Sequence, residues 1–347
     1  MNRIKIYSTL TRIRYWKFLL EIPKWRKNNF WGLYTNNVFE TIKRMIKRTL
    51  CIENPCQLKC RNDQLVVSYD HIKGYEDRAE KTVPVEDIGM LVLEHQQITI
   101  SHYLLDKLVA NNAAVITCNE TRHPSAMLLP LESNTLQSER FRAQVEASEP
   151  LKKQLWQQTV KAKISNQSTV LTQWNIPNKH LNFLSQTVKS GDAENNEAKA
   201  AAYYWSHLFP PAWQFFRKRE GPPPNNLLNY GYAILRATVA RALAGAGLLP
   251  TLGIFHRNRY NAYCLADDIM EPYRPFVDLI VRSIIDKTSA VETLTQELKV
   301  QLLKLPTVDV LLGDETSPLL VATQRTAASL AKCYNGETRK ILYPLLA

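Results

Sequence analysis

The 347-residue chain changes its hydrophobic pattern near residue 130. Short apolar runs, β-branched or alternating in polarity, precede that point, and this pattern is typical of strands. They lie at residues 64–69, 91–93, 98–100 and 114–117. Longer stretches follow and favour helices at residues 137–163, 193–208, 226–246 and 265–286, the last interrupted by Pro272 and Pro275. We therefore predict an α+β fold, with a small, mostly antiparallel β domain at residues 45–130 and a larger all-α-helical domain at residues 131–347.

Local signals refine this division. Ser101 is a predicted helix N-cap, because apolar residues follow it at helical spacing. Residues 130–135 have the composition of a linker. The helix at residues 226–246 is apolar around most of its circumference, so we expect it at the centre of the helical domain. Arg236 and Arg241 within this helix are expected to pair internally or to lie near the functional site.

Most of the net charge of +12 lies in the first 44 residues, which hold ten Lys or Arg residues and two acidic residues. The segment is also rich in aromatic residues. One interpretation is a basic arm that binds nucleic acid or a membrane surface. The interpretation that we favour is an extension upstream of a true start at Met45. The charge of the whole chain is then a weak argument for a polyanionic partner.

Two further features exclude broad classes of protein. No run of about 18 uninterrupted apolar residues occurs, so we expect no membrane span. The six cysteines are too few for a disulfide scaffold and include no CxxC pair. Cys51, Cys56 and Cys60 are close in sequence, but no further Cys or His completes a zinc site nearby. We expect reduced thiols and a cytoplasmic protein.

Three segments of the helical domain combine polar side chains with helical geometry. Glu197 shares a helix face with apolar residues at spacings of four, seven and eleven. His256 follows an apolar stretch. Asp267, Asp268 and Glu271 lie on one helix face, where three acids repel one another unless a cation lies among them. Taken singly, the glutamate is explained as a surface residue and the histidine as a core or cap residue.

Together these segments resemble one family. The motifs are Asn226-Leu-Leu-Asn-Tyr-Gly-Tyr232, Gly253-Ile-Phe-His256 and Leu265-Ala-Asp-Asp-Ile-Met-Glu-Pro-Tyr-Arg-Pro275. In this order they resemble the signature of the CRISPR-associated adaptation endonucleases (the "Cas one" family). The resemblance covers about residues 45–290, with the β domain first, and residues 45–69 and 91–127 resemble the form found in type II systems. The family has nothing similar to residues 1–44.

The resemblance implies a metal-dependent DNA integrase. The family's three metal ligands are Glu, His and either Asp or Glu, and by motif they fall on Glu197, His256 and Glu271. Asp268 matches a second acidic position with an accessory role. Two carboxylates and one neutral imidazole balance the charge of a divalent ion. The oxygen ligands suit Mg²⁺, and the imidazole makes Mn²⁺ at least as suitable.

The resemblance also implies a reaction and a set of partners. The 3′-hydroxyl of a short captured duplex would attack a phosphodiester at the boundary of a CRISPR repeat and so insert a new spacer. The expected partners are double-stranded DNA, a second copy of the chain that dimerises through residues 45–130, and a dimer of the small second adaptation protein. In a type II system the RNA-guided nuclease is a further expected partner. No membrane partner is expected.

We expect basic residues of the helical domain to bind the DNA phosphates. Residues 151–190 contain six lysines and no acidic residue, which indicates either a solvated helical face or a phosphate-binding surface. The candidate DNA contacts are Lys152, Lys153, Lys161, Lys163, Arg217, Lys218, Arg219, Arg257 and Arg259.

Three other functions fit parts of the sequence. A stand-alone metal-dependent nuclease acting on branched DNA or RNA would share the site but would not integrate DNA. A catalytically idle DNA-binding scaffold would tolerate Glu197→Ala in every assay. A helical RNA-binding module would need aromatic stacking motifs, and we find none outside residues 1–44.

Overall fold

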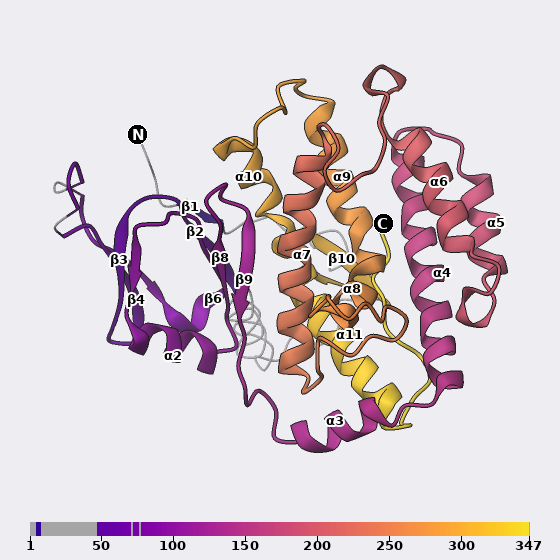
Figure 1. The fold of residues 1–347 in the computed structure, drawn as a ribbon, viewed down its shortest axis with the longest axis horizontal. Helices are drawn as coiled ribbons and strands as arrows, with labels where there is room; N and C mark the ends of the chain where they lie inside the picture. The colour runs from indigo at the N-terminus through magenta and orange to yellow at the C-terminus, as the bar shows by residue number, and fades with distance from the viewer. Residues whose placement is uncertain (1–4, 8–46, 71, 76–77, 347) are drawn as a thin grey trace, which may run out of the picture.

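The computed structural model describes residues 5–7, 47–70, 72–75 and 78–346. A β-rich part comes first in the chain and a mainly helical part follows it (Figure 1), which confirms the predicted α+β class. Of the predicted extension at residues 1–44, only residues 5–7 are described, and they form a short strand. The rest of that extension and the predicted start at Met45 lie outside the described residues.

The β-rich part consists of two sheets and one helix. The first sheet has the strand order β1-β2-β6-β8-β9, and the second has the order β5-β4-β3-β7. The strands are β1 (Lys5–Tyr7), β2 (Arg48–Ile52), β3 (Cys56–Arg61), β4 (Gln64–Ser68), β5 (Lys81–Pro84), β6 (Ile88–Leu93), β7 (Ile98–Ile100), β8 (Ala114–Cys118) and β9 (Pro124–Leu128). The 3₁₀ helix η2 (Val85–Asp87) precedes β6, and helix α2 (His102–Ala110) lies between β7 and β8. The Ser101 side chain accepts the Leu104 amide, which confirms the predicted N-cap.

The prediction of a mostly antiparallel domain is wrong for the centre of the first sheet. Strands β2, β6 and β8 are parallel neighbours there, and β7 is parallel to β3. Parallel neighbours require crossover connections, and the chain makes them through the second sheet and through α2. Five of the six residues of β6 are buried. A continuous apolar run of this kind is typical of a strand covered on both faces, as in a parallel sheet.

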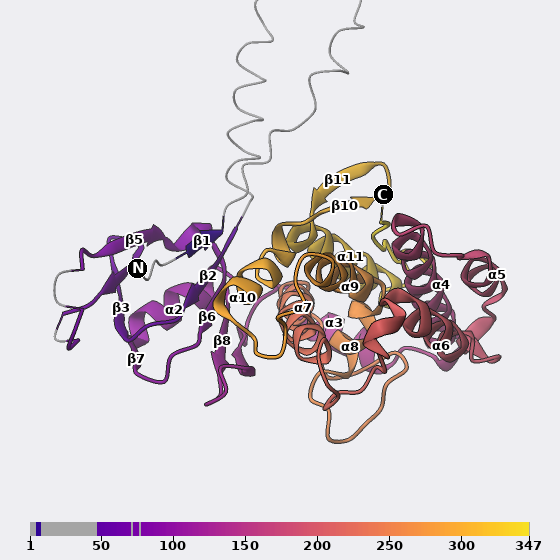
Figure 2. The same ribbon diagram turned by 90° about the horizontal axis from the view of Figure 1, so that it is seen from above.

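The two faces of the first sheet belong to different cores. Leu50, Ile52 and Leu91 pack with the second sheet and α2. Met90 and Val92, which alternate with them, pack into the core of the helical part. Figure 2 shows α7 and α10 next to the β-rich part and α4 to α6 on the far side of the helices. The β-rich part therefore shares a continuous apolar core with the helices.

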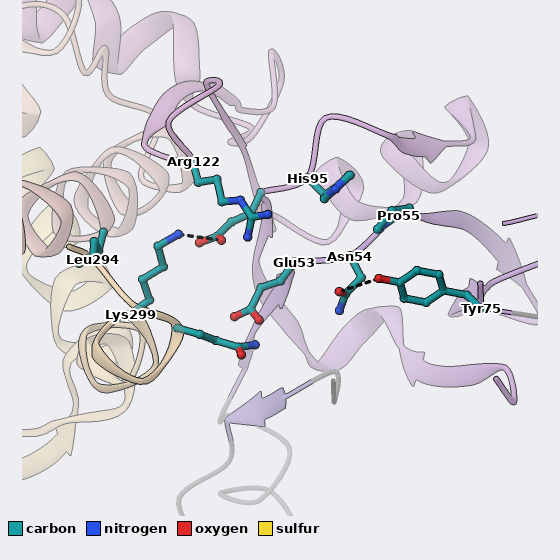
Figure 3. Close-up of a pocket in the computed structure, with 10 residues that line it drawn as sticks. Glu53, Asn54, Pro55, Tyr75, His95, Arg122, Leu294 and Lys299 are labelled. Atoms are coloured by element: carbon teal, nitrogen blue, oxygen red, sulfur yellow. Dashed lines mark hydrogen bonds and ion pairs between the residues drawn. The ribbon is translucent and has the colours of Figure 1, made fainter. Parts of the chain in front are cut away.

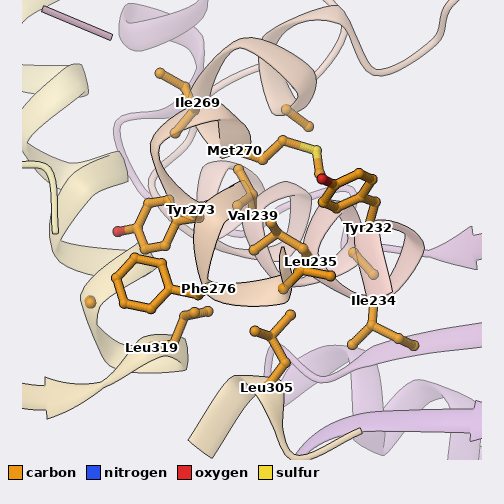
Figure 4. Packing of buried hydrophobic residues seen from close by; sticks show 14 of the residues in the cluster. Tyr232, Ile234, Leu235, Val239, Ile269, Met270, Tyr273, Phe276, Leu305 and Leu319 are labelled. Carbon is orange, nitrogen blue, oxygen red and sulfur yellow. The ribbon is translucent and has the colours of Figure 1, made fainter. Parts of the chain in front are cut away.

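The helical part is built around α7, which has 21 residues and is buried over most of its length. Tyr232, Leu235 and Val239 of α7 contact the apolar side chains of α8 and α9 (Figure 4). The central position predicted for this helix is confirmed. A Cβ atom on Gly231 would lie 2.4 Å from the Val277 side chain, so the glycine allows α7 and α9 to approach closely.

The remaining helices surround α7. In chain order the elements are α3 (Gln137–Val145), α4 (Glu149–Gln173), α5 (Lys179–Thr187), η3 (Ser190–Asp192), α6 (Asn196–Leu208), η4 (Pro211–Trp213), α7 (Asn225–Gly245), α8 (Cys264–Met270), η5 (Glu271–Tyr273), α9 (Arg274–Ile285), α10 (Gln296–Leu302), η6 (Leu305–Thr307) and α11 (Leu319–Tyr334). Within the described residues, no helix has both the length and the apolarity needed to cross a bilayer.

Two predictions for the helical part need correction. The helix predicted at residues 137–163 is two helices, because Ser148 caps a new one by accepting the Leu151 amide and Pro150 lies in its first turn. The domain is also not all-α. Strands β10 (Asp309–Leu312) and β11 (Glu315–Pro318) form an antiparallel hairpin before α11. The hairpin is short, and no strand pattern was recognised there.

Candidate metal centre

Two glutamates that are far apart in the sequence meet at one lysine. The Nζ atom of Lys163, on α4, donates a hydrogen bond of 2.6 Å to Glu197 Oε1. The same nitrogen lies 2.6 Å from Glu271 Oε2. Lys163 is 9 % exposed and Glu271 is 5 % exposed. The structure therefore brings two of the three predicted ligands together around a buried ammonium group.

The loop before α6 holds Glu197 in place. Asp192 accepts the Asn196 amide at 2.9 Å and the Glu197 amide at 3.0 Å, so its carboxylate caps the first turn of α6. Gly191 has φ +68° and packs against the Lys153 side chain of α4. The loop and the helix start are therefore fixed against α4, the helix that carries Lys163.

Asp268 organises the turn that carries His256. Its carboxylate is fully buried and accepts the Ile254, Phe255 and His256 amides at 2.6, 2.9 and 3.3 Å. It also lies 2.5 Å from His256 Nδ1. Since Nδ1 is engaged, Nε2 is the ring nitrogen left to bind a ligand. A Cβ atom on Gly253 would lie 2.3 Å from the His256 carbonyl oxygen, which explains why the motif begins with glycine.

Aromatic contacts place His256 over α4. The Phe255 ring stacks on Trp156 with 4.3 Å between centroids, and the His256 ring meets Trp156 edge-on at 5.8 Å. Trp156 precedes Lys163 by seven residues on α4, so both lie on the same helix face. The turn at residues 253–256 therefore packs on the face of α4 that carries the lysine.

The ionisable side chains of the centre shift one another's pKa values in favour of their charged forms. Burial opposes ionisation of Glu271, but Arg274 and Lys163 hold the pKa of its carboxyl at about 2. Burial also opposes the charge on Lys163, yet Glu271 and Glu197 raise the pKa of the ammonium above its usual value. The hydrogen bond to Asp268 raises the pKa of His256, and both glutamates add to this effect. Arg274 Nε lies 2.8 Å from Glu271 Oε1. The centre therefore has two carboxylates, Glu197 and Glu271, and two cations, Lys163 and Arg274.

The donor set fits a divalent cation, although the ligand atoms are spread wider than around a bound ion. Glu271 Oε2 is buried and faces the same ammonium as Glu197 Oε1, so the two carboxylates already share one cation. A bound ion would take two carboxylates and the free nitrogen of His256 as ligands, which is a donor set that Mg²⁺ and Mn²⁺ accept. The ligand atoms of the three residues do not all lie within 4.8 Å of one another. The ammonium of Lys163 lies between the two carboxylates.

The predicted DNA contacts lie in different environments. Lys163 is not part of a solvated surface, so its assignment as a surface phosphate contact needs correction. Arg217 is held by Asn225 and Asn229, and Arg257 forms an ion pair with Glu149. The exposed candidates are Lys153, Lys218, Arg219, Arg257 and Arg259, and the half-buried ones are Lys152, Lys161 and Arg217.

Both arginines of α7 have internal partners, as predicted. Arg236 donates two hydrogen bonds to Asp267, at 2.7 and 3.0 Å. Arg241 is 1 % exposed and donates to the Asn112 carbonyl oxygen. Sequence reasoning missed the roles of Lys163 and Arg274. The signal for Lys163 was its spacing, since it follows Trp156 by seven residues and so falls on the buried face of α4.

A second polar cluster lies at the junction of the two parts, beside a cavity of about 380 Å³ (Figure 3). The ligand atoms of Cys51, Glu53 and Glu94 lie within 4.8 Å of one another there. However, Glu94 already accepts hydrogen bonds from Lys299 at 2.9 Å and from Tyr230 at 3.0 Å. Burial, with Glu94 and Glu53 nearby, holds the pKa of the Cys51 thiol well above its usual value. We therefore interpret the cluster as a structural ion pair.

Comparison with known proteins identifies the family. The family model "CRISPR associated protein Cas1" matches residues 50–304. The chain is 38% identical over 262 residues to the CRISPR-associated endonuclease Cas1 of Neisseria meningitidis, covering 75% of this chain and 83% of that protein.

Two solved structures share the fold. One is a casposase bound to integration product, with a TM-score of 0.69 and 20% identity over 84% of this chain and 92% of the casposase chain. The other is a Cas6-RT-Cas1–Cas2 complex, with a TM-score of 0.63 and 20% identity over 85% of this chain and 36% of the matched chain. The family model and the Neisseria relative lead to one conclusion: the chain belongs to the Cas1 family of CRISPR-associated proteins.

Proposed function

We propose that the chain is a metal-dependent DNA endonuclease and integrase that inserts new spacers into a CRISPR array. Glu197, His256 and Glu271 are the metal ligands in this proposal. The observation that carries it is the convergence of Glu197 and Glu271 on one buried cation, Lys163. His256 lies near enough for both glutamates to raise the pKa of its imidazole, with Nδ1 held by Asp268 and Nε2 left for a ligand.

The ligand chemistry favours Mg²⁺ or Mn²⁺. Carboxylate oxygens suit both ions, and the imidazole nitrogen makes Mn²⁺ at least as good a fit as Mg²⁺. When bound, a divalent ion supplies Lewis-acid polarisation of the scissile phosphate and stabilises charge on the exchanging oxygens. The protein positions the ligands: Asp268 orients His256, and Arg274 keeps Glu271 ionised.

The proposed reaction exchanges one phosphodiester bond for another. The 3′-hydroxyl of a DNA duplex attacks a backbone phosphorus, the bond from that phosphorus to its original 3′-oxygen breaks, and the leaving oxygen takes up a proton. Since no net bond energy is lost, the step needs no nucleotide cofactor and no covalent enzyme intermediate. The chain has to hold the DNA ends and the target in line, and this alignment supplies much of the rate. With water as the attacking group, the same site would cut DNA.

The partners follow from the family and from the solved complexes. We propose double-stranded DNA as the substrate, because the related casposase was solved with an integration product. We propose a homodimer joined to a dimer of the small second adaptation protein, because a related chain was solved with Cas2. The RNA-guided nuclease of a type II system and a cytoplasmic location complete the proposal. Lys153, Lys218, Arg219 and Arg259 are the exposed basic residues that we propose for DNA phosphates.

A plasmid assay tests the proposal. The purified full chain and the second adaptation protein of the same system are incubated with Mn²⁺, a short DNA duplex and a supercoiled plasmid carrying one CRISPR repeat. We expect joined products with the wild type and none with Glu197→Ala. Cutting without joining would instead support a stand-alone nuclease for branched DNA or RNA. Equal joining by Glu197→Ala and the wild type would refute the assignment of the site.

A further inference from the structure

The Lys163 ammonium occupies the space that a cation shared by Glu197 and Glu271 would need. Its nitrogen is 2.6 Å from an oxygen of each glutamate, so those two oxygens lie within twice that distance of each other. An ion that takes both oxygens as ligands has to enter the same gap, because metal–oxygen distances are shorter still, at about 2.0–2.2 Å. The ammonium and the ion cannot both stay there.

From this geometry we propose that Lys163 is a built-in substitute for the metal, which holds Glu197 and Glu271 together when no divalent ion is bound and is displaced when one binds. The inference rests on the proposed function of this site. It assigns control of metal affinity to Lys163, which is not one of the proposed ligands. Lys163 is thus a positioning residue rather than a catalytic one.

The charge balance of the centre supports the substitution. Without a divalent ion, the carboxylates of Glu197 and Glu271 are offset by Lys163 and Arg274, so the four groups sum to zero. Without such cations, two neighbouring carboxylates, one buried and one half-buried, would repel each other and carry a large desolvation cost. A bound divalent ion adds two positive charges, and each DNA phosphodiester that reaches it offsets one of them. The lysine therefore keeps the empty centre stable, and metal binding makes the centre attractive to an anionic backbone.

The charges show why a metal ion can win this competition. Lys163 Nζ lies 2.6 Å from one oxygen of each glutamate, so a single positive charge is shared between two carboxylates. A divalent ion offers the same two carboxylates twice that charge. The long, flexible lysine side chain can withdraw while it stays attached to α4 beside the centre.

Metal affinity provides the decisive measurement. Mn²⁺ binding to the full chain is followed by calorimetry for the wild type, Lys163→Met, Lys163→Arg and Glu197→Gln. We expect Lys163→Met to bind Mn²⁺ roughly tenfold more tightly or better, because the internal competitor is gone. Lys163→Arg keeps the competing charge and should stay close to the wild type. Lys189→Met is the matched control, since Lys189 pairs with Glu194 on the surface, and it should bind Mn²⁺ as the wild type does.

Thermal unfolding gives a second readout that does not involve catalysis. In EDTA, the Tm of Lys163→Met should fall by about 6 °C or more, because the buried Glu271 and the half-buried Glu197 lose their shared partner. Mn²⁺ should restore that Tm, whereas the wild type should respond much less. If Lys163→Met folds only when Mn²⁺ is present, the proposal is supported in the same way. If it folds in neither condition, the lysine has a role that a metal cannot replace, and the proposal is wrong.

The two proposals fail in different ways. If Glu197→Gln loses Mn²⁺ affinity but Lys163→Met binds no more tightly than the wild type, Lys163 is not a competitor and only this inference falls. If Glu197→Gln binds Mn²⁺ as tightly as the wild type, Glu197 is not a ligand. In that case the proposed function of the site falls, and this inference falls with it.

Discussion

Among the residues that the structure describes, one lysine–glutamate cluster lies buried at the junction of the two parts and another lies at the largely buried candidate metal centre. At the junction, each oxygen of Glu94 accepts one hydrogen bond, from Tyr230 and from Lys299. At the centre, two glutamates share the single charge of Lys163, and Asp268 holds only one ring nitrogen of His256. The first cluster has one cation for its buried carboxylate, while the second has a cation shared between two carboxylates and a ring nitrogen left for a ligand.

This difference separates a structural ion pair from a functional site better than the identity of the residues does. The junction contains a Cys and two Glu residues within 4.8 Å, and it lies beside a cavity. Both features are usual for metal sites. What counts against a ligand there is that the carboxylate of Glu94 is already matched in charge and in hydrogen bonds. The two clusters should therefore respond in opposite ways to substitution.

The largest expected difference is in strand joining. Glu197→Gln removes a proposed ligand and should lower the rate roughly 1,000-fold or more, since a ligated metal supplies several kcal/mol of transition-state stabilisation. Glu94→Gln should join DNA within about threefold of the wild-type rate when assayed well below its Tm. The plasmid assay measures both rates. Equal losses in the two variants would mean that the comparison assigns the wrong cluster to catalysis.

The junction should show its importance in stability instead. Lys299→Met leaves the carboxylate of Glu94 buried without its cation, and such a loss costs about 3–5 kcal/mol in the free energy of unfolding. The double variant Glu94→Leu/Lys299→Met removes both charges and should recover most of that loss. Urea unfolding at pH 7 measures each value, with the surface variant Lys287→Met as a control. A double variant no more stable than Lys299→Met would contradict a paired role.

Asp268 sharpens the comparison within the metal centre itself. Asp268→Asn weakens the anchor on His256 Nδ1 and should reduce Mn²⁺ affinity about 10- to 100-fold, as is usual for groups that orient a metal-ligating histidine. Asp267→Asn is a matched control. It removes an adjacent carboxylate that pairs with Arg236 rather than with the histidine. Calorimetric Mn²⁺ titrations distinguish the two, and equal losses would show that general charge, not histidine orientation, determines affinity.

The sequence predicted the elements of the site better than their contacts. The sequence predicted Glu197 on one helix and Asp267, Asp268 and Glu271 together on another, and in the structure Glu197 lies in the first turn of α6 and Glu271 begins η5 directly after α8. The role of Gly253 and Gly231 is steric, and sequence alone does not show which atoms approach them. Lys163 was assigned to a surface because charge runs are usually solvated. Only the packing of α4 against α6 and η5 shows that one lysine of the run lies inside.

For the fold too, the sequence predicted most of the elements but not how they pair and pack. Alternating and β-branched runs identified strands, but strand direction depends on crossovers that pass through a second sheet, which no local pattern shows. The helix break at Ser148 had a local signal, a cap residue followed two positions later by proline. The hairpin of β10 and β11 is only eight strand residues long and is stabilised by packing against α11. Short elements of this kind depend on tertiary contacts more than on sequence pattern.

Asp278 is a third kind of buried carboxyl, one held by neutral donors. It should give the smallest effect, a change in the free energy of unfolding with pH. Tyr204 donates to it at 3.0 Å and Tyr232 donates to its other oxygen, but no ion pair is formed with it by the described residues. Burial raises the pKa of Asp278 to about 7, against the opposing effect of the tyrosine hydrogen bonds. In the unfolded chain the pKa is near 3.8, so between these values folding takes up a proton.

The stability contributed by Asp278 should therefore fall as pH rises towards 7 and level off above it. Between pH 5.5 and 7.5, the wild type should lose about 2 kcal/mol in the free energy of unfolding relative to Asp278→Asn, which does not titrate. Urea unfolding of both proteins across this range measures the difference between their free energies of unfolding. All other titrating groups are common to the two proteins, so their contributions cancel in that difference. Parallel pH profiles would mean that Asp278 is ionised in the native state. In that case a buried carboxyl held by neutral donors would be charged like the carboxylates of the two lysine clusters, and the proposed difference between them would be wrong.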